Sequence, residues 1–385
     1  MRCLLPIKNE INSKTYNLFV GPLAPILLYT PELLSRGDRP LQMNFEDQLN
    51  ILIHFHLQEH SSARHLIDDL KNNEFARQCI APEDGIGKSS FSEAINERGL
   101  EQLQFVFQEL YKKAAKALPK EYADLGELVS IDGTLIDAVL SMYWADYRQG
   151  SKKAKGHFGF NINQGIPSKV YLTNGKGAER PFVSRILSPG ETGVMDRGYQ
   201  SHKVFDLLQD EGKSFDCRIK ASTTKTIIQE NAVDPDSIVF YDAKVLLGTP
   251  GTNQTEKHVR VVGYEVQGVK YFVATDRHDL TAEQVATIYK LRWRIETFFK
   301  WWKQHLKVYH LITRSEYGLM VQILAGLITY LLMAIYCRQQ FNENVSIKRI
   351  RELRTTILNE LYRSHHRESD EKTIFKEPKK SNAIT

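Results

Sequence analysis

The sequence predicts an α/β fold in which a mostly helical N-terminal region precedes a mixed domain that carries an all-β insertion. Three patterns indicate this order. Apolar residues recur at helical spacing through residues 45–70. From residue 128 to residue 219, short apolar runs typical of buried strands alternate with a helical pattern. Strand-like runs punctuated by glycine then follow one another over residues 219–281.

Composition sets limits on the class of protein. The 385-residue chain is long enough for two or three domains and a large core. Charged residues make up 25% of it and the formal net charge is +5, which permits a polyanionic partner without demonstrating one. The four cysteines are scattered and form no C-x-x-C pair. Their spacing argues against a zinc site or a disulfide framework and suits a reducing compartment.

The N-terminal region, residues 1–122, is predicted to begin as an irregular arm that carries several prolines. A helix within residues 45–70 and a turn at residues 82–85 follow, and Ser90-x-x-Glu93 is typical of a capping box that opens another helix. Such helices can form a helix-turn-helix-like DNA-binding unit, and a purely structural helical domain is an equal alternative. The candidate DNA contacts are Arg64, Lys88 and Arg98.

Two aspartates follow short apolar runs in the second third of the chain. Asp132 comes directly after residues 128–131, and Asp196 comes directly after residues 193–195. Each is predicted to end a buried strand, followed by a turn or by continuing strand. If the two strands are neighbours in one sheet, both carboxylates lie at one edge. Asp137 and Asp146 are local competitors for Asp132, but they lie further from the apolar run.

The pattern Y-x2-R-x3-E-x6-K, formed by Tyr289, Arg292, Glu296 and Lys303, is the most informative feature of the chain. On one continuous helix these four side chains fall within about 60° of one another, and Lys300 projects close to the same sector. Apolar residues occupy a separate face. A lone carboxylate among cations suits a site where phosphate meets a metal ion, because the cations hold the phosphate while the carboxylate holds the metal.

The order Asp132, Asp196, Glu296, the D-R-G-Y that begins at Asp196, and the Y-R-E-K set resemble the DDE transposases of the IS4 group, to which the Tn5 transposase belongs. The resemblance implies an RNase H-like catalytic core over residues 123–340. It implies that the three carboxylates are the catalytic residues and hold two Mg²⁺ or Mn²⁺ ions. The DNA contacts expected around them are Tyr289, Arg292, Lys303, Lys300 and Arg197.

The resemblance implies a DNA transposase that cleaves the ends of an insertion sequence and transfers them into target DNA. Double-stranded DNA, as terminal inverted repeats and as target, is the expected partner of a homodimer in a synaptic complex. A cytoplasmic, nucleoid-associated, prokaryotic protein is expected. Two alternatives stay open. An RNase H-like metal-dependent nuclease without strand transfer would use the same residues, and a catalytically inactive DNA-binding regulator derived from a transposase is disfavoured by the intact carboxylate triad.

The predicted all-β insertion, about residues 221–276, lies between the second aspartate and the glutamate. The IS4 group resembles this arrangement, and in the Tn5-type enzyme a tryptophan of that insertion stacks on a base flipped from the DNA. The insertion here contains no tryptophan. Because any aromatic face can stack on a base, Tyr264, Tyr271 or Phe272 are the candidates to replace it.

Residues 318–337 form a strongly apolar run just long enough to span a bilayer. Gln322 interrupts this run, and no aromatic and basic residues distinguish its two ends. We therefore expect a buried helix packed against the catalytic sheet, with no membrane contact. A basic, mixed-charge C-terminal tail is predicted over residues 341–385.

Overall fold

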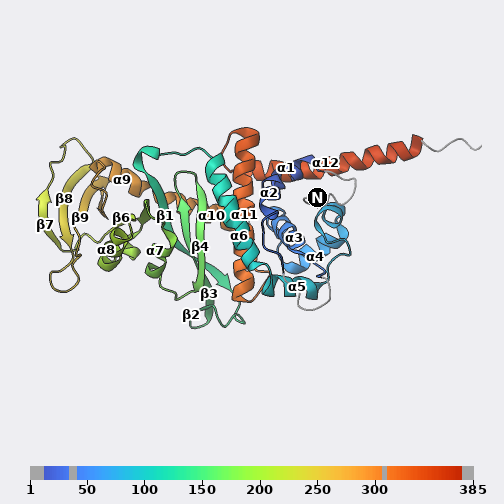
Figure 1. Ribbon diagram of the computed structural model, residues 1–385, viewed down its shortest axis with the longest axis horizontal. Coiled ribbons are helices and arrows are strands. Elements are labelled where there is room, and N and C mark those ends of the chain that lie inside the picture. The colour runs from blue at the N-terminus through green and yellow to red at the C-terminus, as the bar shows by residue number, and fades with distance from the viewer. Residues whose placement is uncertain (1–12, 34–40, 306–309, 375–385) are drawn as a thin grey trace, which may run out of the picture. The chain divides into compact units, whose positions relative to one another are not determined.

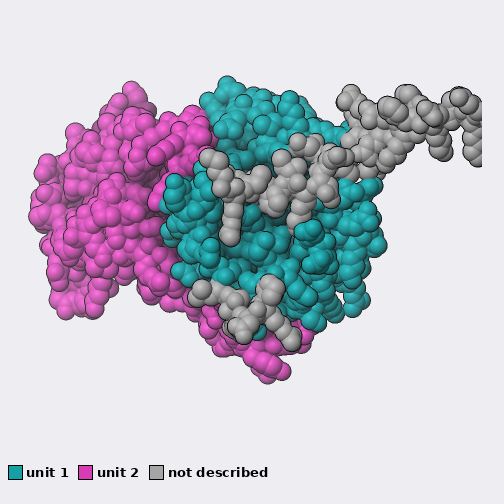
Figure 2. Space-filling view, turned by 45° about the vertical axis from the view of Figure 1, so that its right-hand side comes forward, with its two compact units in different colours: residues 1–110, 305–313, 321–385 teal, residues 111–304, 314–320 magenta. Residues whose placement is uncertain are grey.

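The computed structural model describes residues 13–33, 41–305 and 310–374 of the chain. Contacts divide the chain into two compact units, shown in different colours in Figure 2. The first unit comprises residues 1–110, 305–313 and 321–385, and the second comprises residues 111–304 and 314–320. The three domains predicted from the sequence, with boundaries near residues 122 and 340, stay a prediction.

The second unit is built on a ten-stranded sheet whose first half has an RNase H-like order (Figure 1). β1 (Glu127–Ala138) pairs antiparallel with β3 (Ser151–Asn161), and β3 pairs antiparallel with both β4 (Ile166–Asn174) and the short β2 (Asp146–Arg148). β5 (Glu191–Met195) runs parallel to β1, and β6 (Ser214–Arg218) runs parallel to β5. Three antiparallel strands followed by two parallel ones confirm the predicted RNase H-like α/β core.

The all-β insertion is confirmed, and it extends this sheet. It consists of β7 (Lys225–Glu230), β8 (Val239–Leu247), β9 (Val259–Val266) and β10 (Val269–Thr275), which pair antiparallel in sequence order. β10 then pairs antiparallel with β6, where Ala274 lies opposite Cys217. Gln267 and Gly268 have φ angles of 52° and 76°, as the two-residue turn between β9 and β10 requires. The insertion therefore holds its aromatic residues on the same sheet as β6.

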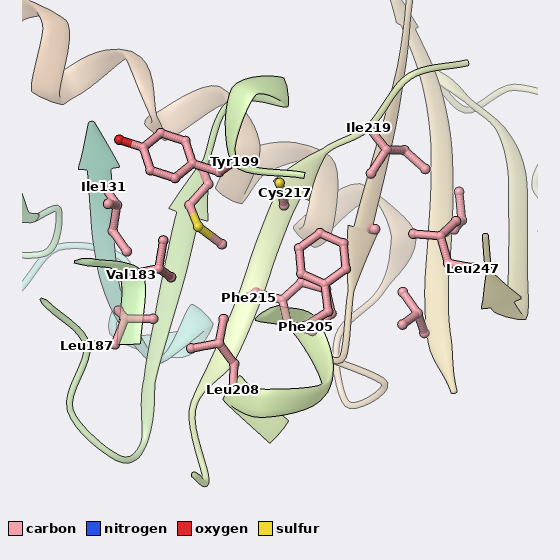
Figure 3. Close-up of a cluster of buried hydrophobic side chains, with 14 of the residues drawn as sticks. Ile131, Val183, Leu187, Tyr199, Phe205, Leu208, Phe215, Cys217, Ile219 and Leu247 are labelled. Carbon is pink, nitrogen blue, oxygen red and sulfur yellow. The ribbon is translucent and has the colours of Figure 1, made fainter. Parts of the chain in front are cut away.

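Helices cover both faces of the sheet. The helices α7 (Val183–Ile186) and α8 (His202–Asp210) pack on one face, where the ring of Phe205 stacks on that of Phe215 with centroids 4.3 Å apart (Figure 3). α9 (Ala282–Leu291) packs in a second apolar cluster with Val262. Successive strand residues point to opposite faces, so burial on both faces explains why the strands read as continuous apolar runs.

The first unit is helical in its described part. It contains α1 (Lys14–Val20), α2 (Ala24–Leu27), α3 (Phe45–Leu57), α4 (Ala63–Asn72), α5 (Lys88–Glu97), the first residues of α6 (Leu100–Ala117), and α12 (Ile347–Ile374). Arg64 and Lys88 are exposed, whereas Arg98 is half-buried with its guanidinium 4.0 Å from the Glu93 carboxylate. A DNA-binding role for these helices stays a prediction.

Two N-terminal predictions are wrong in the described residues. The arm includes helices, because the side chain of Ser13 caps α1 by accepting a hydrogen bond from Tyr16 N at 3.1 Å. Pro22 and Pro25 lie in the first turns of short helices, where proline's missing N–H breaks no intrahelical bond. The predicted capping box at Ser90 does not form, since α5 begins earlier, at Lys88.

The apolar run lies in α11 (Glu316–Phe341). Among the described residues, this is the one helix long and apolar enough to cross a membrane, and 94% of its most apolar window is buried inside the fold. Within the first unit, the ring of Tyr336 packs edge-on against Phe19 with centroids 6.1 Å apart, and His56 Nε2 lies 3.1 Å from the carbonyl oxygen of Gln322. The run is a buried helix, as expected, and its packing against the catalytic sheet stays a prediction.

Candidate active site

The parallel pairing of β1 and β5 places the two predicted aspartates side by side. Ile131 on β1 lies opposite Met195 on β5, so Asp132 and Asp196 each come directly after this pair of residues. Asp132 lies within β1, which continues to Ala138, whereas Asp196 directly follows β5. The side chain of Asp196 accepts a hydrogen bond from Gly198 N at 2.7 Å and caps the single 3-10 turn Arg197–Tyr199.

The helix that carries the Y-R-E-K set is interrupted, which corrects the prediction of one continuous helix. α9 ends at Leu291, Arg292 forms a turn, and α10 spans Trp293–His305. Because Arg292 keeps helical backbone angles, Glu296 still lies one helical turn beyond it. The interruption divides the predicted face, so that Tyr289 lies on α9 while Glu296 and Lys303 lie on α10.

The three predicted carboxylates lie near enough to influence one another's protonation. Burial raises the pKa of Asp132 to about 6, the Arg292 guanidinium opposes this rise, and the negative charges of Asp196 and Glu296 add to it. A like charge nearby disfavours ionisation of a carboxyl group. The three groups therefore form one cluster of negative charge, assembled from β1, the end of β5 and α10.

Arg292 lies between two of these carboxylates. Its Nη2 donates to Glu296 Oε1 at 2.6 Å, and its Nη1 lies 4.0 Å from Asp132 Oδ2. The side chain is only 14% exposed, so solvent screens these interactions weakly. Arg292 is thus the counter-cation of the carboxylate cluster.

The other predicted DNA contacts differ in their surroundings. Lys303 is half-buried and its Nζ donates to the carbonyl oxygen of Leu135 at 2.9 Å, and burial lowers the pKa of this ammonium group. Tyr289 is 7% exposed and belongs to the core cluster under α9. Lys300 and Arg197 are exposed. Lys300 and Arg197 are therefore free to meet a large ligand, whereas Tyr289 and Lys303 have structural contacts as well.

Sequence patterns missed a fourth carboxylate beside the site. Glu179 packs so closely on β1 that a Cβ at Gly133 would lie 2.9 Å from its Oε1 atom. Burial, together with the charges of Glu179, Asp132 and Asp196, raises the pKa of the Tyr199 hydroxyl. Tyr199 is the last residue of the D-R-G-Y motif, and its buried hydroxyl lies among these acids. Glu179 lies in a loop between Asp132 and Asp196 in the sequence, where no spacing rule could single it out.

A second missed residue, Arg218, ends β6 and extends the site toward the insertion. Its guanidinium lies over the ring of Tyr271, 4.7 Å from the centroid, and Tyr271 stacks on Tyr264 with centroids 5.3 Å apart. These three residues, with Tyr289 and Arg292, are among those lining a cavity of about 430 Å³. The carboxyl ends of parallel strands meet at one sheet edge, and that rule could have indicated Arg218.

The donor set fits divalent metal ions. Mg²⁺ and Mn²⁺ prefer oxygen ligands, and Asp132, Asp196 and Glu296 offer carboxylate oxygens. Arg292 contacts two of these carboxylates, since its Nη2 lies 2.6 Å from Glu296 Oε1 and its Nη1 lies 4.0 Å from Asp132 Oδ2, so a single guanidinium is shared between them. A bound cation would supply further positive charge.

An RNase H-like sheet with this carboxylate cluster defines a class, the metal-dependent enzymes that act on nucleic acid strands. The chain belongs to the family described as the transposase DDE domain, whose model matches residues 124–332. It is 27% identical over 209 residues to a transposase assigned to insertion sequence element IS5377 of Geobacillus stearothermophilus, covering 53% of this chain and 55% of that protein. It therefore spans about half the length of that relative.

A second relative agrees with this family, and the chain is also similar to one solved structure. The chain is 25% identical over 254 residues to a transposase assigned to insertion sequence element IS4SA of Synechocystis, covering 64% of this chain and 71% of that protein. Among solved structures, it is similar to a chain of the piggyBac transposase synaptic complex with hairpin DNA, with 10% identity, a TM-score of 0.45, and coverage of 98% and 88%. The predicted DDE transposase family is confirmed, and the IS4 group stays a prediction.

Proposed function

We propose that this protein is a DNA transposase that cuts DNA at the ends of an insertion sequence and joins those ends to target DNA. One observation carries the proposal. The pairing of β1 with β5 sets Asp132 beside Asp196, and Arg292 lies near both Asp132 and Glu296, in a chain that belongs to the DDE transposase family. The three carboxylates would hold two Mg²⁺ or Mn²⁺ ions, which when bound activate the attacking oxygen and stabilise the leaving oxygen.

Cleavage and joining are one reaction with two nucleophiles. A water oxygen attacks the phosphorus at the element's end, the P–O3′ bond breaks, and a 3′-hydroxyl and a 5′-phosphate are left. In strand transfer that 3′-hydroxyl loses its proton and attacks a target phosphodiester, a new P–O bond forms as the target's P–O3′ bond breaks, and the target's 3′-hydroxyl is released. Neither step needs a covalent protein–DNA intermediate. The protein's part is to bind phosphates, with Arg292, Lys303 and Lys300 as the proposed contacts.

The proposed partner is double-stranded DNA, held by a homodimer in a synaptic complex. The second unit supplies a suitable polar hollow of about 620 Å³, which begins at the turn after Asp196. Its lining includes four cationic side chains: Arg180, Arg197, Lys203 and Lys220. Cations gathered beside the carboxylates suit the phosphates that flank a cleavage point. A cytoplasmic, nucleoid-associated location follows from this function and is part of the proposal.

The test is incubation of the protein with Mg²⁺ and DNA that carries the element's own ends, with products mapped at single-nucleotide resolution. A transposase yields cuts at the ends and joined products in target DNA. Cuts without joined products would instead indicate an RNase H-like nuclease that does not carry out strand transfer. Binding without any cut would indicate the inactive regulator.

The reaction is expected to depend on pH through Asp132. Its pKa of about 6 in the metal-free protein means that protons compete with metal ions below that pH. At low Mg²⁺ concentration the rate should fall about tenfold per pH unit below the pKa, because one proton must leave before the ion binds. Excess Mg²⁺ should move the midpoint to lower pH. Initial rates at two Mg²⁺ concentrations measure this, and a midpoint that ignores Mg²⁺ would contradict it.

The stacked tyrosines of the insertion are expected to differ in role. Both line the cavity, but Tyr264 is only 4% exposed whereas Tyr271 is half-buried. Tyr271→Ala should slow second-strand processing of pre-cut ends by about tenfold, since stacking on a base contributes roughly 1–3 kcal/mol, and should leave first-strand nicking nearly unchanged. Tyr264→Ala should chiefly lower the melting temperature.

Nicking assays, hairpin assays on pre-cut ends and thermal denaturation separate the two roles. Tyr271→Phe is the matched control, because it keeps the aromatic face. If Tyr271→Ala slowed both steps equally and lowered the melting temperature as Tyr264→Ala does, both rings would be packing residues.

A further inference from the structure

Three potential metal ligands meet in the first unit, on residues that the proposed reaction does not use. His54 lies on α3, His60 lies in the turn after it, and Asp69 lies on α4. One ligand atom from each lies within 4.8 Å of the other two. His54 Nε2 is 2.7 Å from Asp69 Oδ2, and His60 Nε2 is 3.4 Å from the same oxygen.

The backbone is bent in a way that presents His60 to the other two residues. α3 ends at Leu57, and Glu59 adopts a left-handed conformation with φ of 56°. This conformation is unfavourable for a residue other than glycine, so it persists where the surrounding structure enforces it. His60 N then donates to the carbonyl oxygen of Phe55 at 3.2 Å, which holds the turn against α3.

The cluster is buried and its polar atoms lack partners. His54 is 1% exposed and His60 is 3% exposed. Nδ1 of His54 and Nδ1 of His60 have no hydrogen-bond partner among the described residues, and Nε2 of His60 has only the 3.4 Å contact with Asp69 Oδ2. Burying an imidazole nitrogen without a partner is unfavourable, and buried polar atoms are normally satisfied by protein, water or an ion. Of these nitrogens, Nε2 of His60 faces the Asp69 carboxylate, and it is the one that a bound ion would satisfy.

We propose that His54, His60 and Asp69 bind one Zn²⁺ ion, which fastens the turn between α3 and α4. Two imidazoles and a carboxylate are ligands that Zn²⁺ takes, whereas Mg²⁺ and Ca²⁺ prefer oxygen alone. Tetrahedral coordination at the usual bond lengths separates ligand atoms by roughly 3.3 Å, close to the 3.4 Å between His60 and Asp69. The 2.7 Å pair, His54 with Asp69, would open slightly as the ion replaces their shared proton.

The types of ligand agree with this geometry. The scattered cysteines argue only against a zinc site that is built from thiolates. The site proposed here contains no cysteine. A fourth position is left for water or for His65, whose ring lies edge-on to His60 with centroids 4.8 Å apart. The site is of the structural type, because it joins one helix to the next within a buried cluster.

Metal analysis of the full-length protein, produced without a histidine tag, tests the proposal. We expect about one zinc per chain after dialysis. A strong chelator should remove it and lower the melting temperature, and added Zn²⁺ but not Mg²⁺ should restore that temperature. Asp196→Asn should keep its zinc, which separates this site from the proposed catalytic metal site. A parent protein without zinc, whose melting temperature responds to neither chelator nor Zn²⁺, would overturn the proposal.

Two variants locate the ion, and one serves as the control. His60→Ala and Asp69→Asn should each weaken zinc binding by at least the roughly 10–100-fold that loss of an outer partner costs. His258→Ala removes an exposed imidazole of the second unit and should leave zinc content unchanged. Unchanged zinc affinity in both ligand variants would place the ion elsewhere and refute the site. If either variant fails to fold, the response of the parent protein to Zn²⁺ still decides whether the ion binds.

Discussion

Replacing Asp132, Asp196 or Glu296 by alanine is expected to lower DNA cleavage by about a thousandfold or more, with binding to the element's ends largely intact. Each carboxylate contributes to one charge cluster, since both other acids raise the pKa of Asp132. Bound metal ions contribute several kcal/mol to such a displacement, and each step of about 1.4 kcal/mol is a factor of ten in rate. Removing any one ligand should therefore have nearly the full effect.

Cleavage of end-bearing DNA and gel-shift binding measure the two properties separately. Asp137→Ala is the matched control, because Asp137 lies on the same strand but its side chain is 83% exposed and pairs with Lys153. It should cleave at nearly the parent rate. If a triad variant cut DNA as fast as Asp137→Ala, the replaced residue would not be a metal ligand. Another residue would then have to take its place in the proposed site.

The second large effect is expected at Arg292. Arg292→Ala should reduce cleavage by about 10²–10³-fold, the usual cost of losing one preorganised group that stabilises charge in the transition state. It should also move the pH midpoint of the reaction upward, because Arg292 holds down the pKa of Asp132. If Arg292 contacts phosphate as well, the slope of log affinity against log salt should fall by about one unit.

Three further variants help to explain the result expected for Arg292→Ala. Arg292→Lys should recover only part of the activity, since an ammonium group cannot reproduce the planar fork that meets Glu296. Lys303→Ala should also lower the salt slope by about one unit if this side chain leaves Leu135 to meet phosphate. Arg294→Ala, two residues further along the chain, is the control, because its guanidinium pairs with Glu121 and with the carbonyl oxygen of Ile162. An Arg292 variant with unchanged pH midpoint and salt slope would have only a packing role.

Some of the site is readable from sequence because its residues are held by regular elements. Asp132 and Asp196 follow apolar runs that become neighbouring parallel strands, and the position after the paired residues is the same on both. The Y-R-E-K spacing indicates a helix, and Glu296 lies on one. These local patterns, with the family resemblance, were enough to predict the RNase H-like core, its β-insertion and the DDE family.

Other parts depend on contacts between distant segments, which no local pattern records. The break at Arg292, the packing of Glu179 on Gly133 and the position of Arg218 beside Tyr271 arise from how strands and loops meet in the folded sheet. Likewise, the histidines of the first unit are scattered in the sequence, and His54 and His60 form a cluster with Asp69 only in the folded chain.

The sequence by itself thus determined the class of fold, the family and the order of the three carboxylates, because strand and helix periodicity and motif spacing act over short stretches of chain. Only the tertiary structure decided that the insertion extends the central sheet, that Arg292 is the counter-cation of Asp132 and Glu296, and that His54, His60 and Asp69 converge. The physical reason is that these features depend on distances and burial between residues far apart in sequence. Burial changes the electrostatics of a charged group, and periodicity says nothing about which other charges share its surroundings.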